Sequence, residues 1–168
     1  GSQSSSTSSS TTTGHQYGRQ GVVTVPAEMQ GTWYSSDNGS NSKITFGKNT
    51  IVGEDGQQYH LYKQDPNFLA GDTPSTSVQN ATRYWSSAHF VDVHGLHFLN
   101  IRGWCQTAGD GSSYAIHTET VNGKQVKVLV VAEGAEYWTS GVYYQNPQLA
   151  KQQADKKFDD LHYMEDDN

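Results

Sequence analysis

Cysteine is almost absent from this chain: Cys105 is the single thiol among 168 residues. An internal disulfide cannot form, which excludes the small scaffolds that depend on disulfide bonds. A chain of this size can bury enough surface to be held together by an ordinary hydrophobic core. We predict that Cys105 faces this core and behaves there as a small apolar side chain.

Positive charge is also scarce. Eleven Lys and Arg residues stand against 17 Asp and Glu, which gives a formal net charge of −6, and no basic cluster offsets this locally. Binding to a phosphate backbone depends on positive charge, so nucleic acid is not an expected partner. The sequence also contains no membrane-length apolar run, no signal peptide, no glycine-rich phosphate loop and no G-x-S-x-G motif. No cofactor is predicted.

The N-terminal part has a composition of its own. Residues 1–19 are dominated by serine and threonine and carry almost no apolar side chains. Burial in such a segment cannot offset the entropy lost on ordering, so we predict a disordered tether at 1–19 and a single domain at 20–168. Gly1-Ser2 is typical of a cloning scar, and we therefore expect the natural chain to continue upstream.

A tether of this composition, joined to a cysteine-poor domain rich in Gly, Tyr and Gln, resembles surface lipoproteins and secreted proteins of Gram-positive bacteria. The resemblance implies an extracellular protein anchored to the cell surface as a lipoprotein. Its membrane attachment would be a lipidated cysteine upstream of Gly1. The alternative interpretation is a disordered cytoplasmic tail.

Turn signals are frequent and specific. Asn38-Gly39, Asp55-Gly56, His94-Gly95 and Asn122-Gly123 each separate runs of alternating, β-branched or aromatic residues, which is the pattern of tight β-hairpins. These signals predict an all-β antiparallel meander. The expected strands are 20–25, 30–36, 41–47, 50–53, 57–63, 82–93, 96–104, 113–121 and 124–132, with a short one at 142–145. Residues 64–80, rich in Pro and small polar side chains, are expected to form a long loop.

One amphipathic helix is expected after the last strand, at about 147–161. Asn146-Pro147 supplies an N-cap and a first-turn proline, and an apolar stripe follows at helical spacing. Its members are Ala150, Ala154, Phe158 and Leu161. Strand 124–132 is apolar on both faces, so the helix is predicted to pack outside the sheet and to cover the second face.

A turn centred on Asn38-Gly39 pairs Trp33 with Ile44 and Gly31 with Phe46, which places Trp33 in a core layer. Gly31-x-Trp33, an all-β meander and one late helix together resemble the lipocalin and related calycin folds over residues 28–161. The resemblance implies a barrel or strongly curved sheet, with Trp33 near an internal ligand cavity. Residues 128–163 also resemble a repeated theme in secreted proteins of lactic-acid bacteria.

The hairpin at 82–104 carries the strongest candidate binding site. Its predicted register puts Ala88/Ile101 and Phe90/Leu99 on a core face, and a second set of pairs on the opposite face. That set is Trp85/Trp104, Ser87/Arg102 and His89/Asn100. Two tryptophans edged by Arg102, His89 and Asn100 form a flat aromatic surface that suits sugar rings or peptide segments. The alternative is that another strand or the 64–80 loop covers this face.

The histidines do not predict a metal site. His89 and His97 point to opposite faces of their hairpin and His94 lies in its turn, whereas zinc needs three or four converging ligands. His117 and Glu119 lie two residues apart on one predicted strand and therefore share a face. They predict either an acid–base pair or a solvated rim.

The predicted function is non-enzymatic extracellular binding of a small hydrophobic or carbohydrate ligand. The ligand would occupy the aromatic surface of Trp85, Trp104 and Arg102 or a barrel cavity near Trp33. Two alternatives remain open. The first is an adhesion module for cell-wall or host glycans, and the second is a hydrolase that uses His117 and Glu119.

Overall fold

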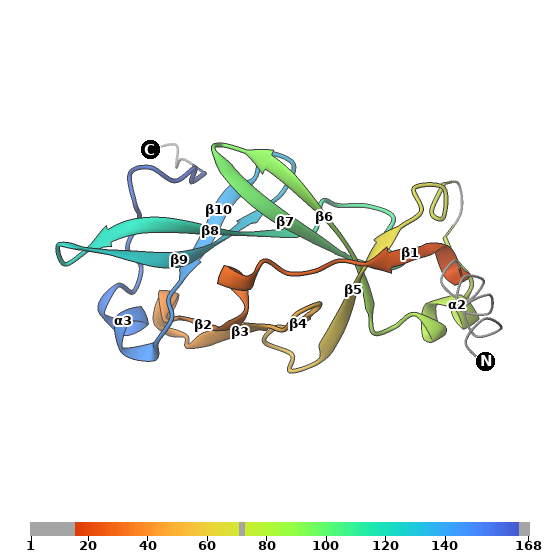
Figure 1. Ribbon diagram of the computed structural model, residues 1–168, viewed down its shortest axis with the longest axis horizontal. Coiled ribbons are helices and arrows are strands. Elements are labelled where there is room, and N and C mark those ends of the chain that lie inside the picture. Colours follow the sequence, from red (N-terminus) through yellow and green to blue (C-terminus); the bar gives the residue numbers. More distant parts are fainter. Residues whose placement is uncertain (1–15, 71–72, 165–168) are drawn as a thin grey trace, which may run out of the picture.

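The structure is a computed structural model that describes residues 16–70 and 73–164 (Figure 1). Most of the tether expected at 1–19 lies outside the described residues. Its last residues are ordered within the fold: a 3-10 turn, η1 (Gln16–Gly18), leads into strand β1 (Arg19–Val22). The two other short 3-10 segments are η2 (Ala27–Met29) and η3 (Asp37–Gly39).

The protein is mostly β, and its strands form one mixed sheet. The order of neighbours is β10-β9-β8-β7-β6-β5-β4-β3-β2, while β1 pairs with β5. The remaining strands are β2 (Gly31–Ser35), β3 (Ser42–Phe46), β4 (Thr50–Val52), β5 (Gln58–Gln64), β6 (Trp85–Val93), β7 (Leu96–Gly103), β8 (Ser112–Val121), β9 (Lys124–Glu133) and β10 (Trp138–Tyr143).

The registers predicted from Asn38-Gly39 and His94-Gly95 are confirmed, except that the second ladder ends before the predicted Trp85/Trp104 pair. Trp33 pairs with Ile44 and Gly31 with Phe46, although the loop between β2 and β3 is longer than two residues. In the β6–β7 hairpin, Ser87 pairs with Arg102, and the pairs that follow toward the turn are also those predicted. His94-Gly95 and Asn122-Gly123 have positive φ at both residues, as tight β-hairpins require.

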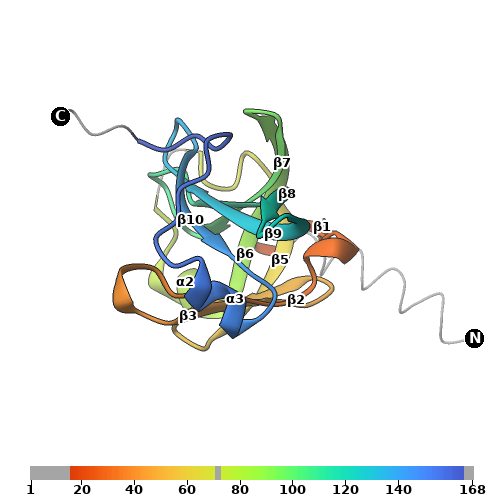
Figure 2. The same cartoon turned by 90° about the vertical axis from the view of Figure 1, so that its left-hand side faces the viewer.

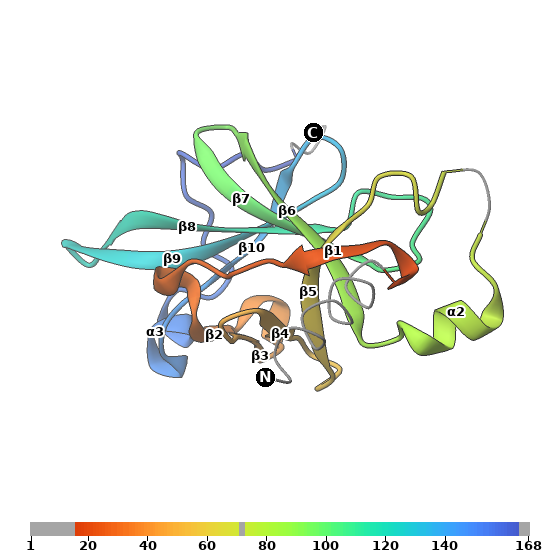
Figure 3. The ribbon, with the colours of Figure 1, turned by 45° about the vertical axis from the view of Figure 1, so that its right-hand side comes forward.

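The prediction of a purely antiparallel meander is wrong at one place, because β5 and β6 pair in parallel. The chain between them includes helix α2 (Thr76–Ala81) and brings β6 in alongside β5 in the same direction. The loop expected at 64–80 therefore contains a helical turn, capped by the Ser75 side chain. Figure 3 shows α2 at one end of the molecule, beyond β5 and β1.

Of the two predicted forms, a barrel or a strongly curved sheet, the barrel is wrong, because the sheet is not closed. Its two ends meet at one isolated pair, where the backbone N–H groups of Tyr34 and Tyr144 each donate to the other's carbonyl over 2.7 Å. Tyr34 lies in β2 and Tyr144 follows β10. A continuous ladder between these end strands would be needed for closure.

Two hydrophobic cores lie on opposite faces of the sheet. The first gathers Trp33, Phe46, Leu99, Leu129 and other residues along β2 to β9. The second lies between β7–β10 and the C-terminal segment, and includes Phe98, Val128, Val130, Ala150 and Phe158. Strand β9 is therefore buried on both faces, as its sequence predicts. Figure 2 views the sheet and the C-terminal segment from the α3 end.

The predicted C-terminal helix is shorter than expected. Helix α3 (Pro147–Gln152) starts as predicted, with the Asn146 side chain accepting from the Leu149 N–H over 2.7 Å, but it ends before 161. Asp155 has a positive φ and exchanges two hydrogen bonds with Asp37 and Asn38 in η3. These tertiary contacts replace a further helical turn, and the following segment still brings Phe158 into the second core.

Candidate functional site

The two indoles of the predicted site are in contact, but their rings are perpendicular and not coplanar. The ring centroids of Trp85 and Trp104 are 5.2 Å apart, and the ring planes meet at 86°. The last pair of the β6–β7 ladder is Ser86–Gly103, so Trp104 lies in the turn beyond the ladder. Its side chain is 2% exposed and donates its Nε1–H to the carbonyl of Tyr17 over 2.9 Å. The flat surface expected from strand pairing does not form.

One side of Trp85 is covered by strand β1. The guanidinium of Arg19 lies 4.6 Å from the Trp85 ring centroid and 4.9 Å from that of Tyr62. Tyr62 packs edge-to-face against both indoles. Cation–π and edge-to-face contacts of this kind hold the rings in fixed orientations. On this side, the alternative in which a neighbouring strand covers the tryptophans is the one observed.

A pocket of about 400 Å³ opens beside the same residues. We call it the Arg102 pocket. Two arginines and four aromatic side chains line it, namely Arg83, Arg102, Tyr59, Trp85, Trp104 and Tyr114. The remaining lining residues are neutral, so no carboxylate of the described residues lines the pocket. Its volume falls within the range of small-molecule sites, which begins at about 300 Å³.

Two carboxylates lie just behind the pocket wall, and both are already hydrogen-bonded. The Tyr59 hydroxyl donates to Asp55 Oδ2 over 3.2 Å, and the Ser112 hydroxyl donates to Glu133 at 2.9 Å. Burial raises the pKa of Glu133, which means that its negative charge is disfavoured where it stands. Among the described residues that line the pocket itself, the charged side chains are Arg83 and Arg102, and both are positive.

The loop at 106–112 holds Arg102 in place. One guanidinium nitrogen, Nη2, donates to the Gln106 carbonyl over 3.2 Å, whereas the buried Nε has no hydrogen-bond partner within the described ranges. Gly111 has a φ of +70°, and a Cβ at this position would collide with the Ile101 carbonyl oxygen and lie 2.6 Å from Arg102 Cγ. Glycine is thus required for the loop to pack this closely over the arginine.

Asn100 fixes the other end of this loop. It is buried, and its side-chain amide donates to the Asp110 carbonyl over 2.7 Å and to the Ser113 hydroxyl over 2.9 Å. His89, its partner across the β6–β7 ladder, is exposed. Neither residue lines the Arg102 pocket. Asn100 therefore acts on the pocket indirectly, by holding the loop that packs on Arg102.

Substitution of Asn100 by alanine is expected to lower the free energy of unfolding by about 1–3 kcal/mol, because the substitution leaves buried hydrogen-bonding groups unpaired. Urea denaturation measures this change. The matched control is His89→Ala on the opposite strand, for which a change within about 0.5 kcal/mol is expected. Equal effects of the two substitutions would contradict a structural role for the amide.

Trp33, the remaining predicted site residue, lies in the first core. Its side chain is 1% exposed, and its Nε1–H donates to the Met29 carbonyl over 2.8 Å. The structure thus brings Trp85, Trp104 and Arg102 together at one pocket and places Trp33, His89 and Asn100 elsewhere. A binding role for any of them stays a prediction.

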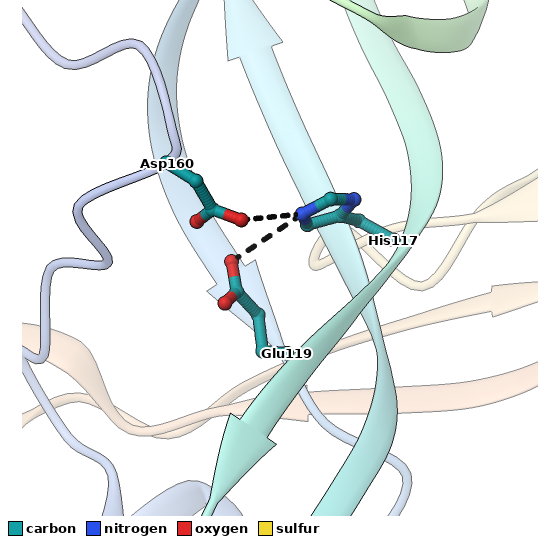
Figure 4. Close-up of side chains that lie close together, drawn as sticks. All are labelled: His117, Glu119 and Asp160. Carbon is teal, nitrogen blue, oxygen red and sulfur yellow. Dashed lines mark hydrogen bonds and ion pairs between the residues drawn. The ribbon is translucent and has the colours of Figure 1, made fainter.

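A second group of side chains meets on the face of β8 that carries the second core, where His117, Glu119 and Asp160 point toward one another (Figure 4). His117 Nε2 lies 2.8 Å from Asp160 Oδ2 and 3.6 Å from Glu119 Oε2. His117 and Glu119 share one face of β8, as their spacing predicts. Asp160 comes from the C-terminal segment after α3.

The two carboxyl groups of this cluster titrate in opposite directions. Burial raises the pKa of Glu119 to about 7, and the neighbouring Asp160 adds to the rise. Hydrogen bonding to Glu119 and His117 lowers the pKa of Asp160. Negative charge is therefore favoured on Asp160 and disfavoured on Glu119.

Several residues of both sites are not apparent from the sequence. Asp160 falls inside the helix expected at 147–161, and nothing in that pattern directs it toward β8. Tyr59 and Tyr114 could have been found, because each is an aromatic residue within a predicted strand. Arg83 reaches the pocket only because α2 precedes β6.

Comparison of the chain with models of protein families, with curated proteins and with solved structures found no match. Among the described residues, none of the helices is both long enough and apolar enough to cross a membrane. The geometry of the two sites is therefore the basis for assigning a function.

Proposed function

We propose that this chain is a non-enzymatic extracellular binding protein whose ligand is an acidic carbohydrate held in the Arg102 pocket. The observation that carries the proposal is the composition of the pocket wall. Two arginines and four aromatic rings surround about 400 Å³, with no carboxylate among the described lining residues, in a chain with a net charge of −6. A local excess of positive charge on an acidic protein favours an anionic ligand.

The orientation of the polar groups supports a ligand with one charged end. Arg102 presents a planar guanidinium, which matches the geometry of a carboxylate or phosphate better than a lysine would. Its Nε has no hydrogen-bond partner within the described part of the chain, so the guanidinium keeps an unused donor. Arg83 is exposed at the same pocket and supplies a second positive charge.

The aromatic groups support a ring-shaped body for the same ligand. Trp85 is half-buried, and Tyr59 and Tyr114 also line the pocket without being fully buried. Aromatic faces provide contact area at a small cost in conformational entropy and pack well against sugar rings. The pocket therefore fits a single acidic sugar residue better than an extended apolar chain. Tethering at the cell surface is proposed from the Ser/Thr-rich composition of residues 1–19 alone.

The test is a titration of tryptophan fluorescence with glucuronic acid and with glucose, which differ in the carboxylate. We expect saturable binding of the acid and at least tenfold weaker binding of the neutral sugar. Arg102→Gln should weaken binding of the acid by about 1.5–3 kcal/mol, because it removes charged hydrogen bonds.

Lys124→Gln is the matched control, since it removes one positive charge at the start of β9 from a residue that does not line the pocket. It should leave the affinity unchanged. Equal affinity for the acid and the neutral sugar, or equal effects of the two substitutions, would contradict the proposal. Binding of an acidic polysaccharide without binding of the monosaccharide would instead support the adhesion module.

A further inference from the structure

We propose that His117, Glu119 and Asp160 form a binding site for a divalent transition-metal ion, with Zn²⁺ as the reference ion. This site shares no residue with the Arg102 pocket, and the inference does not depend on the proposed function. It differs from the expectation drawn from the sequence, where the histidines predicted no metal site.

The geometry of the donor atoms is the first observation. One imidazole nitrogen and two carboxylate oxygens lie within 4.8 Å of one another. The three atoms face a common point in Figure 4 and come from two segments, β8 and the chain after α3. Ligands at about 2.0–2.2 Å from a tetrahedral ion lie about 3.3–3.6 Å from one another. His117 Nε2 and Glu119 Oε2, 3.6 Å apart, already have this spacing, whereas Asp160 Oδ2, 2.8 Å from His117 Nε2, must move slightly away from it.

The second observation is an unsatisfied oxygen at the centre of the cluster. Glu119 is 8% exposed, and its Oε2 has no hydrogen-bond partner within the residues described. This oxygen faces His117 at 3.6 Å. A buried polar atom without a partner is costly and therefore uncommon, and it is often explained by a water or an ion. A bound cation would give Oε2 the partner that the protein does not supply.

The ligand set distinguishes between classes of metal. Calcium and magnesium prefer oxygen ligands alone, whereas zinc and neighbouring transition metals accept imidazole nitrogen together with carboxylate oxygen. Three protein ligands leave a position for water, which is the arrangement of an open zinc site. The cluster therefore favours Zn²⁺ over Ca²⁺ or Mg²⁺.

Charged groups around the cluster leave the carboxylates available. Lys156, Lys157 and Asp159 line an adjoining pocket of about 320 Å³ that reaches Glu119 and Asp160. The Lys156 ammonium lies over the Phe158 ring, 5.3 Å from its centroid. No lysine in the described part forms an ion pair with Glu119 or Asp160. An ion can thus approach from the adjoining pocket without displacing a bound lysine.

The experiment is isothermal titration of the whole chain with ZnCl₂, followed by competition with excess CaCl₂ and MgCl₂. We expect one ion per chain, retained in the presence of calcium and magnesium. Asp160→Asn and His117→Gln should each weaken binding at least about 100-fold, since loss of supporting residues alone typically costs about 10–100-fold. Asp160 is 53% exposed, so its substitution should not prevent folding.

The matched control is the double substitution Asp92→Asn with His97→Gln. This pair also joins an imidazole to a carboxylate, at 2.6 Å, but it offers two ligands and is exposed. The double variant should bind zinc with the same affinity as the wild-type chain. His94→Gln tests a rival arrangement, because His94 lies against His162 with ring centroids 3.9 Å apart. Loss of zinc binding in His94→Gln but not in His117→Gln would overturn the assignment.

A second readout separates a metal site from a purely structural hydrogen-bond network. Zinc should raise the midpoint of thermal unfolding of the wild-type chain, because it binds the folded state across two segments. The increase should vanish in Asp160→Asn, whose midpoint without zinc is measured alongside. If Asp160→Asn lowers the midpoint without zinc and leaves the zinc-induced increase intact, the cluster is structural and the proposal is wrong.

Discussion

Replacing Trp33 by alanine is expected to lower the free energy of unfolding by about 3–5 kcal/mol. The side chain is 1% exposed in the first core and packs among residues from β2 to β9. The substitution leaves a large cavity and removes the hydrogen bond to the Met29 carbonyl. Urea denaturation followed by circular dichroism measures the change. An effect below about 1 kcal/mol would show that this core is not packed as described.

The same variant tests what the resemblance to lipocalins implies for the ligand. A site inside a barrel would bring the ligand near Trp33, whereas the Arg102 pocket does not include this residue. We expect Trp33→Ala, studied at a temperature where it remains folded, to bind glucuronic acid within about twofold of the wild-type affinity. A selective loss of binding would move the ligand site into the first core.

Local sequence signals predicted the parts of the fold that depend on neighbouring residues. His94-Gly95 and Asn122-Gly123 fix the registers of their hairpins, because few residue types adopt positive φ at both turn positions. Once a register is fixed, the residues that share each face follow from the alternation of side chains. This is why the spacing of His117 and Glu119 suffices to place both on one face.

Features that depend on distant contacts could not be predicted in this way. The parallel pairing of β5 with β6 is set by the path of a long connection, on which turn chemistry has no influence. The end of α3 is set by hydrogen bonds between Asp155 and η3, more than a hundred residues away in sequence. Asp160 can reach β8 because α3 ends at Gln152 and the chain that follows is not helical. Strand periodicity therefore brings together two of the three residues of the candidate metal site, and the third depends on tertiary contacts.

The pocket illustrates the same limit at shorter range. Ser87 and Arg102 pair as expected, but the ladder stops at Gly103, and Trp104 turns inward beyond it. The pairing pattern alone extends past the end of the strand and exposes an indole that is in fact buried. The predicted ladder was one residue pair too long. The two tryptophans therefore form part of a pocket wall and not the flat surface that was expected.

Strand β9 is the strand whose truncation should affect stability on both faces of the sheet, because adjacent residues on it point into different cores. Leu129 is fully buried in the first core, and Val130 is fully buried in the second. In a sheet with one solvated face, one of two neighbouring residues would be exposed and tolerant of truncation. Here both truncations must leave a cavity, since each side chain is enclosed by its own core.

We expect Leu129→Ala to cost about 2–5 kcal/mol of unfolding free energy and Val130→Ala about 2 kcal/mol, from lost burial plus the cavity that remains. Gln125→Ala, exposed on the same strand, should change stability by less than about 0.5 kcal/mol. Urea denaturation of the three variants measures the differences. A negligible effect of Val130→Ala would mean that the C-terminal segment does not cover the second face, and Asp160 would then have no fixed position beside His117.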